Sequence, residues 1–128
     1  MDQFQKYAPL ISRLFIGGFF LISGVSKLGN VEGFTGYLQM GGLPGFLAWP
    51  AIAFEIAVGL SMLLGFQARL VALAGAGFCI VTAVLYHSNF ADPTMQIMFL
   101  KNFAIAGGFL MIFASGAGPV SLDKAKAA

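Results

Sequence analysis

The sequence is poor in charge: aspartate, glutamate, lysine and arginine together make up only 9% of its 128 residues. A soluble domain of this length needs far more charged surface, so the composition excludes that class of protein. The basic residues are scattered and exceed the acidic ones by only two charges, which excludes a nucleic-acid-binding surface. We therefore expect no nucleic-acid partner.

Cysteine and histidine each occur once, as Cys79 and His87. A single cysteine excludes an internal disulfide, a C-x-x-C redox pair and a four-thiolate metal site within one chain. A single histidine gives little support to a haem or metal site, so we expect no bound metal. The sequence contains no P-loop, no dinucleotide fingerprint and no Ser/His/Asp nucleophile set. The nucleotide-binding proteins and hydrolases that carry these motifs are thereby excluded.

Hydrophobic residues, by contrast, make up 59% of the chain. Four segments come near the roughly 20 apolar residues that are needed to cross the hydrocarbon core of a bilayer. These predicted spans are residues 9–28, 46–66, 70–88 and 94–115. We therefore predict an all-α fold, an integral membrane four-helix bundle with up-down topology. The bundle forms a single membrane domain over residues 1–128, and the lipid bilayer is its first partner.

The connections between the spans also carry information. Pro9 lies where the first span can begin, because proline has no amide N–H and the first residue of a helix needs none. Asn30 can cap a short helix that Gly41 and Gly42 would end, and this segment would lie on the membrane interface between the first two spans. A plain loop with an aromatic anchor is the alternative. The connection at residues 67–69 is so short that we expect the second and third spans to be packed neighbours.

The distribution of basic residues predicts the orientation of the bundle. One side of the predicted membrane holds Lys6, Arg69, Lys124 and Lys126. The other side holds Glu32 and Asp92, with only Lys27 near its boundary. The positive-inside rule then places both termini in the cytoplasm. An even number of spans requires the two termini to lie on the same side. The orientation predicted from the basic residues therefore agrees with the four spans predicted from hydropathy.

Glu55 lies near the centre of the second span, where a charge costs roughly 2.5 to 3.5 kcal/mol on insertion scales. We therefore expect it to face other helices. At a rise of about 1.5 Å per residue, Arg13 and Lys101 bracket Glu55 in depth, and both can lean toward it. One hypothesis is a buried ion pair or triad that only fixes the order of the helices. Another is that the second base serves an anionic or quinone-like ligand, and a third is proton or ion passage.

Residues at helical spacing share faces with these charges. On the first span, Gly17, Gly24 and Lys27 lie on the face of Arg13, and on the third span Cys79 lies on the face of His87. Our candidate catalytic residues are Glu55, Lys101 and Arg13. The candidate ligand-pocket residues are Gly17, Gly24, Lys27, Gly59, Cys79, His87 and Gly108.

Several motifs occur in an order that resembles a known family. The first span ends in GVSKL, the second carries E-x-x-x-G-L and then LLGFQAR, and Lys101 is followed by Gly107-Gly108 and a terminal G-x-G-P-V-S-L-D. In this order and spacing, from about Arg13 to Asp123, the chain is similar to the DoxX family of small bacterial inner-membrane proteins. The resemblance implies a multi-pass protein of the bacterial inner (plasma) membrane, described in that family as an oxidoreductase component.

Relatives in the family are associated with quinone-linked thiosulfate oxidation and with membrane complexes that handle oxidative stress. By position, the polar residues of the family correspond to Arg13, Lys27, Glu55, Arg69 and Lys101 here. We therefore expect a membrane-integral component of a quinone-linked redox system, with quinone as the candidate cofactor.

Three questions stay open at this point. The chain could instead be a non-enzymatic membrane anchor or assembly partner for a soluble oxidoreductase, or a small-molecule or proton transporter. Whether it is an enzyme is undecided. A homo-oligomer and a soluble oxidoreductase subunit are both candidate partners.

Overall fold

Helix α1 opens the chain and runs from Asp2 to Leu28. The computed structural model describes the backbone of residues 2–127 and the side chains of residues 2–125. The elements are α1 (Asp2–Leu28), α2 (Val31–Met40), the 3-10 turn η1 (Gly45–Leu47), α3 (Ala48–Leu64), α4 (Ala68–Tyr86), α5 (Pro93–Ser115) and α6 (Leu122–Ala127). The described residues contain no β-strand, and the predicted all-α fold is confirmed.

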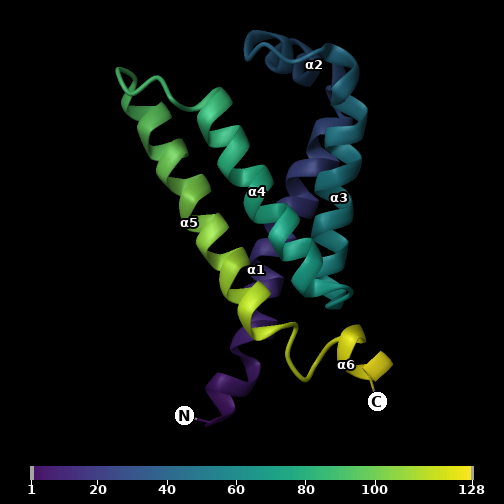
Figure 1. Ribbon diagram of the computed structural model, residues 1–128. Coiled ribbons are helices and arrows are strands. Elements are labelled where there is room, and N and C mark those ends of the chain that lie inside the picture. Colours follow the sequence, from purple (N-terminus) through teal and green to yellow (C-terminus); the bar gives the residue numbers. More distant parts are fainter. Residues whose placement is uncertain (1, 128) are drawn as a thin grey trace.

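Four helical segments of the described chain are long and apolar enough to cross a membrane: Asp2–Leu28, Gly45–Leu64, Ala68–Tyr86 and Pro93–Ser115. The predicted four-helix membrane protein is therefore confirmed. The N and C ends lie at the same end of the bundle (Figure 1), as the up-down topology requires. That this end is cytoplasmic stays a prediction. The side chain of Lys126, one of the bases used to predict it, lies outside the described residues.

Local sequence signals set the ends of the shorter elements. The side chain of Asn30 accepts a hydrogen bond of 3.0 Å from the amide of Gly33, so the predicted capped helix forms as α2. Asp92 caps α5 in the same way, ahead of Pro93 in its first turn. Gly65 ends α3 with a φ of 69°, in the left-handed region that glycine adopts without strain.

The long helices form two close pairs, α1 with α3 and α4 with α5, and the pairs contact each other less extensively. In the first pair, a Cβ atom added at Gly59 would lie 2.6 Å from the backbone nitrogen of Leu21. In the second pair, a Cβ atom at Gly75 would lie 2.5 Å from the ring of Phe109. Glycine therefore permits both close approaches. In Figure 1 the two pairs meet at the end that carries the termini and diverge toward α2.

The core lies where the two pairs meet. Phe109 is fully buried, and Phe20 packs edge-on against it with ring centroids 5.4 Å apart. Phe78 contacts the other side of this cluster, 6.2 Å from Phe20. Small residues of α4 complete the core, because Ala72 and Ala76 leave room for the aromatic rings between the helices. This aromatic core joins the two helix pairs.

Two features of the fold differ from the sequence-based expectations. Helix α1 begins at Asp2 and contains Pro9, whereas we expected it to begin at Pro9. A proline removes only one amide donor, and the exposed residues before it still continue the helix. Helices α3 and α4 are not closely packed along their length, although residues 65–67 join them tightly. The short connection fixes only the adjoining ends, while the glycine contacts select the partners of each pair.

Candidate functional site

A cavity of about 880 Å³ lies between the diverging helices, and α1 to α5 all contribute to its wall. We call it the interhelical cavity. Its wall is largely apolar, and seven aromatic side chains line it: Phe19, Phe20, Phe34, Tyr37, Phe54, Phe78 and Tyr86. A concave, mostly apolar site of this size with a few polar groups is typical of sites that bind small molecules. The aromatic wall favours a ligand that carries a flat ring.

Glu55 and Lys27 form the ion pair of this cavity. The Nζ atom of Lys27 lies 2.8 Å from both carboxylate oxygens of Glu55 and 2.9 Å from the Oγ atom of Ser23. The Glu55 side chain is 8% exposed and that of Lys27 is 27% exposed. The Lys27 ammonium also lies 5.1 Å from the centroid of the Phe34 ring on α2. Glu55 therefore faces other helices, as expected, but its partner is Lys27.

Arg13 was expected beside Glu55, and the structure places it elsewhere. Its Nε atom donates to the carbonyl of Ala117 and its Nη1 atom to the carbonyl of Met62, each at 2.9 Å, while Nη2 donates to the carbonyl of Val120. Arg13 precedes Lys27 by 14 residues on α1, which is about 21 Å along the helix axis. Arg13 is fully buried and joins the end of α3 to the chain that follows α5.

Lys101 lines the cavity from α5 without a carboxylate partner. Its Nζ atom lies 5.2 Å from the centroid of the Phe19 ring, and among the described residues the only salt bridge is the one between Lys27 and Glu55. The wall of the cavity thus holds two lysines and one carboxylate. Lys27 takes the place where we expected Arg13, and Lys101 lies in the wall of the same cavity.

A polar cluster that the sequence analysis missed lies beside Cys79. The Nδ2 atom of Asn102 donates to Thr82 Oγ1 at 3.0 Å and to the Cys79 carbonyl at 3.3 Å, which ties α5 to α4. An amide side chain in a membrane span is a signal for such an interhelical bond, and Asn102 directly follows Lys101. The backbone carbonyl of Cys79 is therefore engaged, and its thiol is buried at the cavity wall.

His87 follows the last residue of α4 and also lines the cavity. It is only 7% exposed, and its Nδ1 atom is buried with no hydrogen-bond partner. Burial lowers the pKa of His87, and the positive charge of Lys101 lowers it further. Both effects favour the neutral imidazole.

Helix α2 covers the wide end of the cavity. The ring of Tyr37 on α2 stacks on the ring of Tyr86 on α4, with centroids 4.8 Å apart and planes inclined by 20°. The hydroxyl of Tyr86 donates to the carbonyl of Leu38 at 2.9 Å. A Cβ atom at Gly41 would overlap the Tyr86 ring, so α2 can be held this closely only with glycine at that position. These contacts hold α2 against α4 at the wall of the cavity.

The glycines expected in the ligand pocket lie in helix contacts instead. Gly17 and Gly59 meet each other between α1 and α3, and Gly24 lies against Ile56 and Glu55 of α3. Gly108 lies against Ile16, between α5 and α1. None of these four lines the interhelical cavity. Because glycine has no side chain, the neighbouring helix packs directly against its backbone.

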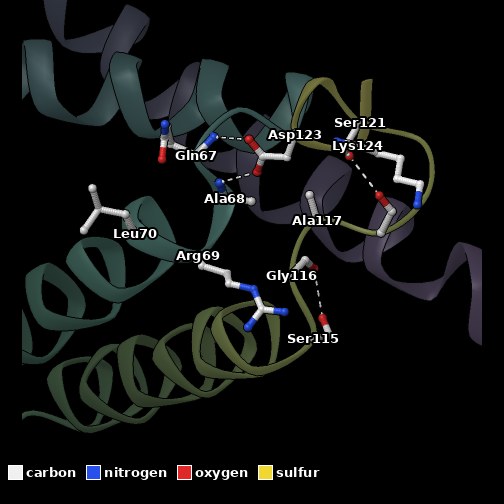
Figure 2. Close-up of a pocket in the computed structure, with 11 residues that line it drawn as sticks. Gln67, Ala68, Arg69, Leu70, Ser115, Gly116, Ala117, Ser121, Asp123 and Lys124 are labelled. Atoms are coloured by element: carbon white, nitrogen blue, oxygen red, sulfur yellow. Dashed lines mark hydrogen bonds between the residues drawn. The ribbon is translucent and has the colours of Figure 1, made fainter. Parts of the chain in front are cut away.

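A second, polar pocket of about 540 Å³ lies at the end of the bundle that carries the termini. The Asp123 carboxylate accepts hydrogen bonds from the amides of Gln67 and Ala68, at 2.7 and 2.8 Å (Figure 2). It therefore caps α4 from the far end of the chain. The Arg69 side chain reaches toward Gly116, where an added Cβ would lie 3.1 Å from its guanidinium. These contacts hold the C-terminal segment in place.

Comparison with known proteins identifies the family of the chain. The model of the DoxX family matches residues 8–88. The chain belongs to the DoxX family. It is 37% identical over 124 residues to the inner membrane protein YqjF of Escherichia coli (strain K12), covering 97% of this chain and 95% of YqjF. It is 32% identical to the inner membrane protein YphA of the same organism, covering 90% of this chain and 87% of YphA. No solved structure matches the chain.

The inner-membrane localisation expected from the sequence is confirmed by these DoxX relatives and by the four long apolar helices. The DoxX match contains Lys27, Glu55, Cys79 and His87 but ends before α5. Lys101 therefore lies outside the matched segment, although the similarity to YqjF covers nearly the whole chain and so extends across α5.

Proposed function

We propose that this DoxX protein is the membrane-integral, quinone-binding component of a redox system, and that the quinone ring occupies the interhelical cavity. The observation that carries the proposal is an apolar, aromatic cavity whose wall holds two lysines but only one carboxylate. A quinone is apolar enough to reach the cavity from the bilayer. Its carbonyl oxygens gain negative charge on reduction, and an ammonium without a carboxylate partner can stabilise that charge.

Each charged residue then has a defined part. Lys101 donates a hydrogen bond to a quinone oxygen and stabilises the reduced, anionic form. When an oxidoreductase partner supplies electrons to the quinone, Glu55 relays a proton to the reduced oxygen, and Lys27 holds the Glu55 carboxylate in place at 2.8 Å. Arg13 has no part in ligand binding, because backbone carbonyls use its donors.

The test begins with purification in mild detergent and identification of co-purifying lipids and proteins. The stripped protein is then titrated with a short-chain quinone. We expect Lys101→Met to weaken quinone binding by about ten-fold or more, because the lost hydrogen bond has a charged donor. Helicity and thermal stability should stay near those of the parent, since Lys101 is exposed and has no ion-pair partner within the described residues.

Lys6→Met is the matched control. Lys6 is also an exposed lysine whose ammonium lies near an aromatic ring, 5.5 Å from the centroid of Tyr7, but it does not line the cavity. Equal quinone binding by the parent and both variants would remove Lys101 from the site. Absence of any bound quinone, together with a stoichiometric soluble oxidoreductase, would favour a membrane anchor over the function proposed here.

A further inference from the structure

The polar pocket at the end of the bundle that carries the termini holds charged groups that the proposed function does not use. Arg69 of α4 and Lys124 of α6 both line this pocket, and both side chains are exposed (Figure 2). Within the part of the chain that the structure describes, neither side chain makes a hydrogen bond or a salt bridge. Their N–H donors are therefore available to a ligand.

Arg69 lies beside the chain that follows α5. Its guanidinium is close to Gly116, where an added Cβ atom would be 3.1 Å from both Nε and Nη2. A basic side chain beside a helix C-terminus can donate to the last carbonyls of that helix, but the Arg69 side chain donates to no carbonyl within residues 2–127. The fold therefore holds this guanidinium at the wall of the pocket without using its donors.

The carboxylate in the wall of this pocket belongs to Asp123 and is already engaged. It accepts hydrogen bonds from the backbone amides of Gln67 and Ala68. Arg69 and Lys124 contribute two positive charges and Asp123 one negative charge, which leaves one positive charge in the wall. Cationic donors that the chain itself leaves unpaired, beside a carboxylate that already has partners, favour an anionic ligand.

The position of the pocket favours a lipid over a soluble anion. The pocket lies where α4 begins and α5 ends, so in a bilayer it is at the level of the lipid headgroups. Leu70 lines the pocket and is 67% exposed, and Leu73, nearly one turn further along α4, is 47% exposed. An acyl chain can therefore lie against α4 while the headgroup occupies the polar pocket.

We propose that this pocket binds the phosphate group of an anionic phospholipid, with Arg69 as the main binding residue. The planar guanidinium donates paired hydrogen bonds to the phosphate oxygens, a geometry that arginine forms and lysine does not. Lys124 adds a second positive charge, and Leu70 contacts the acyl chain. Basic pockets between membrane helices bind phospholipid headgroups by the same chemistry. The pocket is separate from the interhelical cavity, so this inference does not depend on quinone binding.

Isotope labelling of arginine gives a direct test, because the chain has only two arginines. The full chain is placed in maltoside micelles, which contain no phosphate, and the Nε–H signals are followed by NMR as a short-chain phospholipid is added. Arg13 is the internal control, because it is buried and binds backbone carbonyls. We expect phosphatidylglycerol to shift the signal of Arg69 but not that of Arg13, and to bind about five-fold more tightly than phosphatidylcholine.

Arg69→Gln removes the charge and the paired donors, so it should weaken phosphatidylglycerol binding by about five-fold, as measured by native mass spectrometry. Arg69→Lys keeps only the charge and should lose less. Lys6→Gln is the matched control, because it removes a positive charge from the same end of the bundle but outside the pocket. The melting temperature of each variant without lipid shows whether it is folded.

Three results would overturn the inference. An unmoved Arg69 signal in the parent protein would do so whatever the variants show. Equal weakening by Arg69→Gln and Lys6→Gln would mean that the lipid responds to surface charge in general. Glycerol phosphate that binds as tightly as phosphatidylglycerol would show that the ligand is a soluble phosphate and would exclude the lipid assignment.

Discussion

The ion pair between Lys27 and Glu55 allows a double-mutant test of the cavity. Breaking a fully buried pair by removing one partner costs about 3–5 kcal/mol, whereas an exposed pair contributes about 0.2–1 kcal/mol. Glu55 is 8% exposed and Lys27 is 27% exposed, so this pair lies between the two limits. We expect Glu55→Gln and Lys27→Met each to lower the free energy of unfolding by about 2 kcal/mol.

The double variant should lose much less than the sum of the two. Once one partner is gone, removing the other takes away a charge that was already uncompensated, so the total loss should stay near about 2 kcal/mol. The coupling energy is then also about 2 kcal/mol. Unfolding is followed in mixed micelles by titration with a denaturing detergent, with helicity as the signal.

Arg13 provides the matched control for this cycle. It lies about 21 Å from Lys27 along α1 and binds backbone carbonyls, so Arg13→Gln and Glu55→Gln should add within about 0.5 kcal/mol. Strict additivity of the Lys27 and Glu55 variants would refute the ion pair. Strong coupling between Arg13 and Glu55 would refute the arrangement of α1 against α3 on which the cavity rests.

Three further predictions concern the packing of the helices and the wall of the cavity. Gly75→Val should lower the free energy of unfolding by about 1–3 kcal/mol because its side chain would enter the Phe109 ring, whereas Gly77→Val, which meets open space, should change the melting temperature little. Tyr86→Phe keeps the ring stack but removes the hydrogen bond to α2, so hydrogen exchange in α2 should become faster while the global stability falls by only about 1 kcal/mol. The folded-state pKa of His87 lies below its unfolded value of about 6.5, so the unfolded chain binds more protons and stability falls as the pH drops below that value. His87→Gln should flatten this dependence in melting curves recorded between about pH 7.5 and pH 5.5.

Hydropathy and capping signals were enough to predict most of the fold. Each long apolar run became a long helix, and Asn30 capped the short helix where expected. Such signals act within one element and need no knowledge of its neighbours. The helix partners could not be predicted in this way, because the contact between Gly17 and Gly59 depends on two surfaces that are distant in the sequence.

The partner of Glu55 was mispredicted because depth was counted along the backbone alone. Lys27 lies in the last turn of α1, where the count places it near the membrane surface. Side chains on a helix lean toward its N-terminus, and here that direction points into the bundle. The bond from Lys27 to Ser23, one turn earlier, shows this tilt. A long, flexible lysine thereby reaches Glu55, which lies about 10 Å inside the start of α3.

The three hydrogen bonds of Arg13 bear on how the protein is made. Arg13 enters the membrane with the first helix, but its acceptors are on Met62, Ala117 and Val120. Two of them are translated only after α5 is complete. Until then the guanidinium must stay solvated by lipid headgroups or by the insertion machinery. Synthesis that stops at the end of α5 therefore leaves two of the three hydrogen bonds of Arg13 unmade.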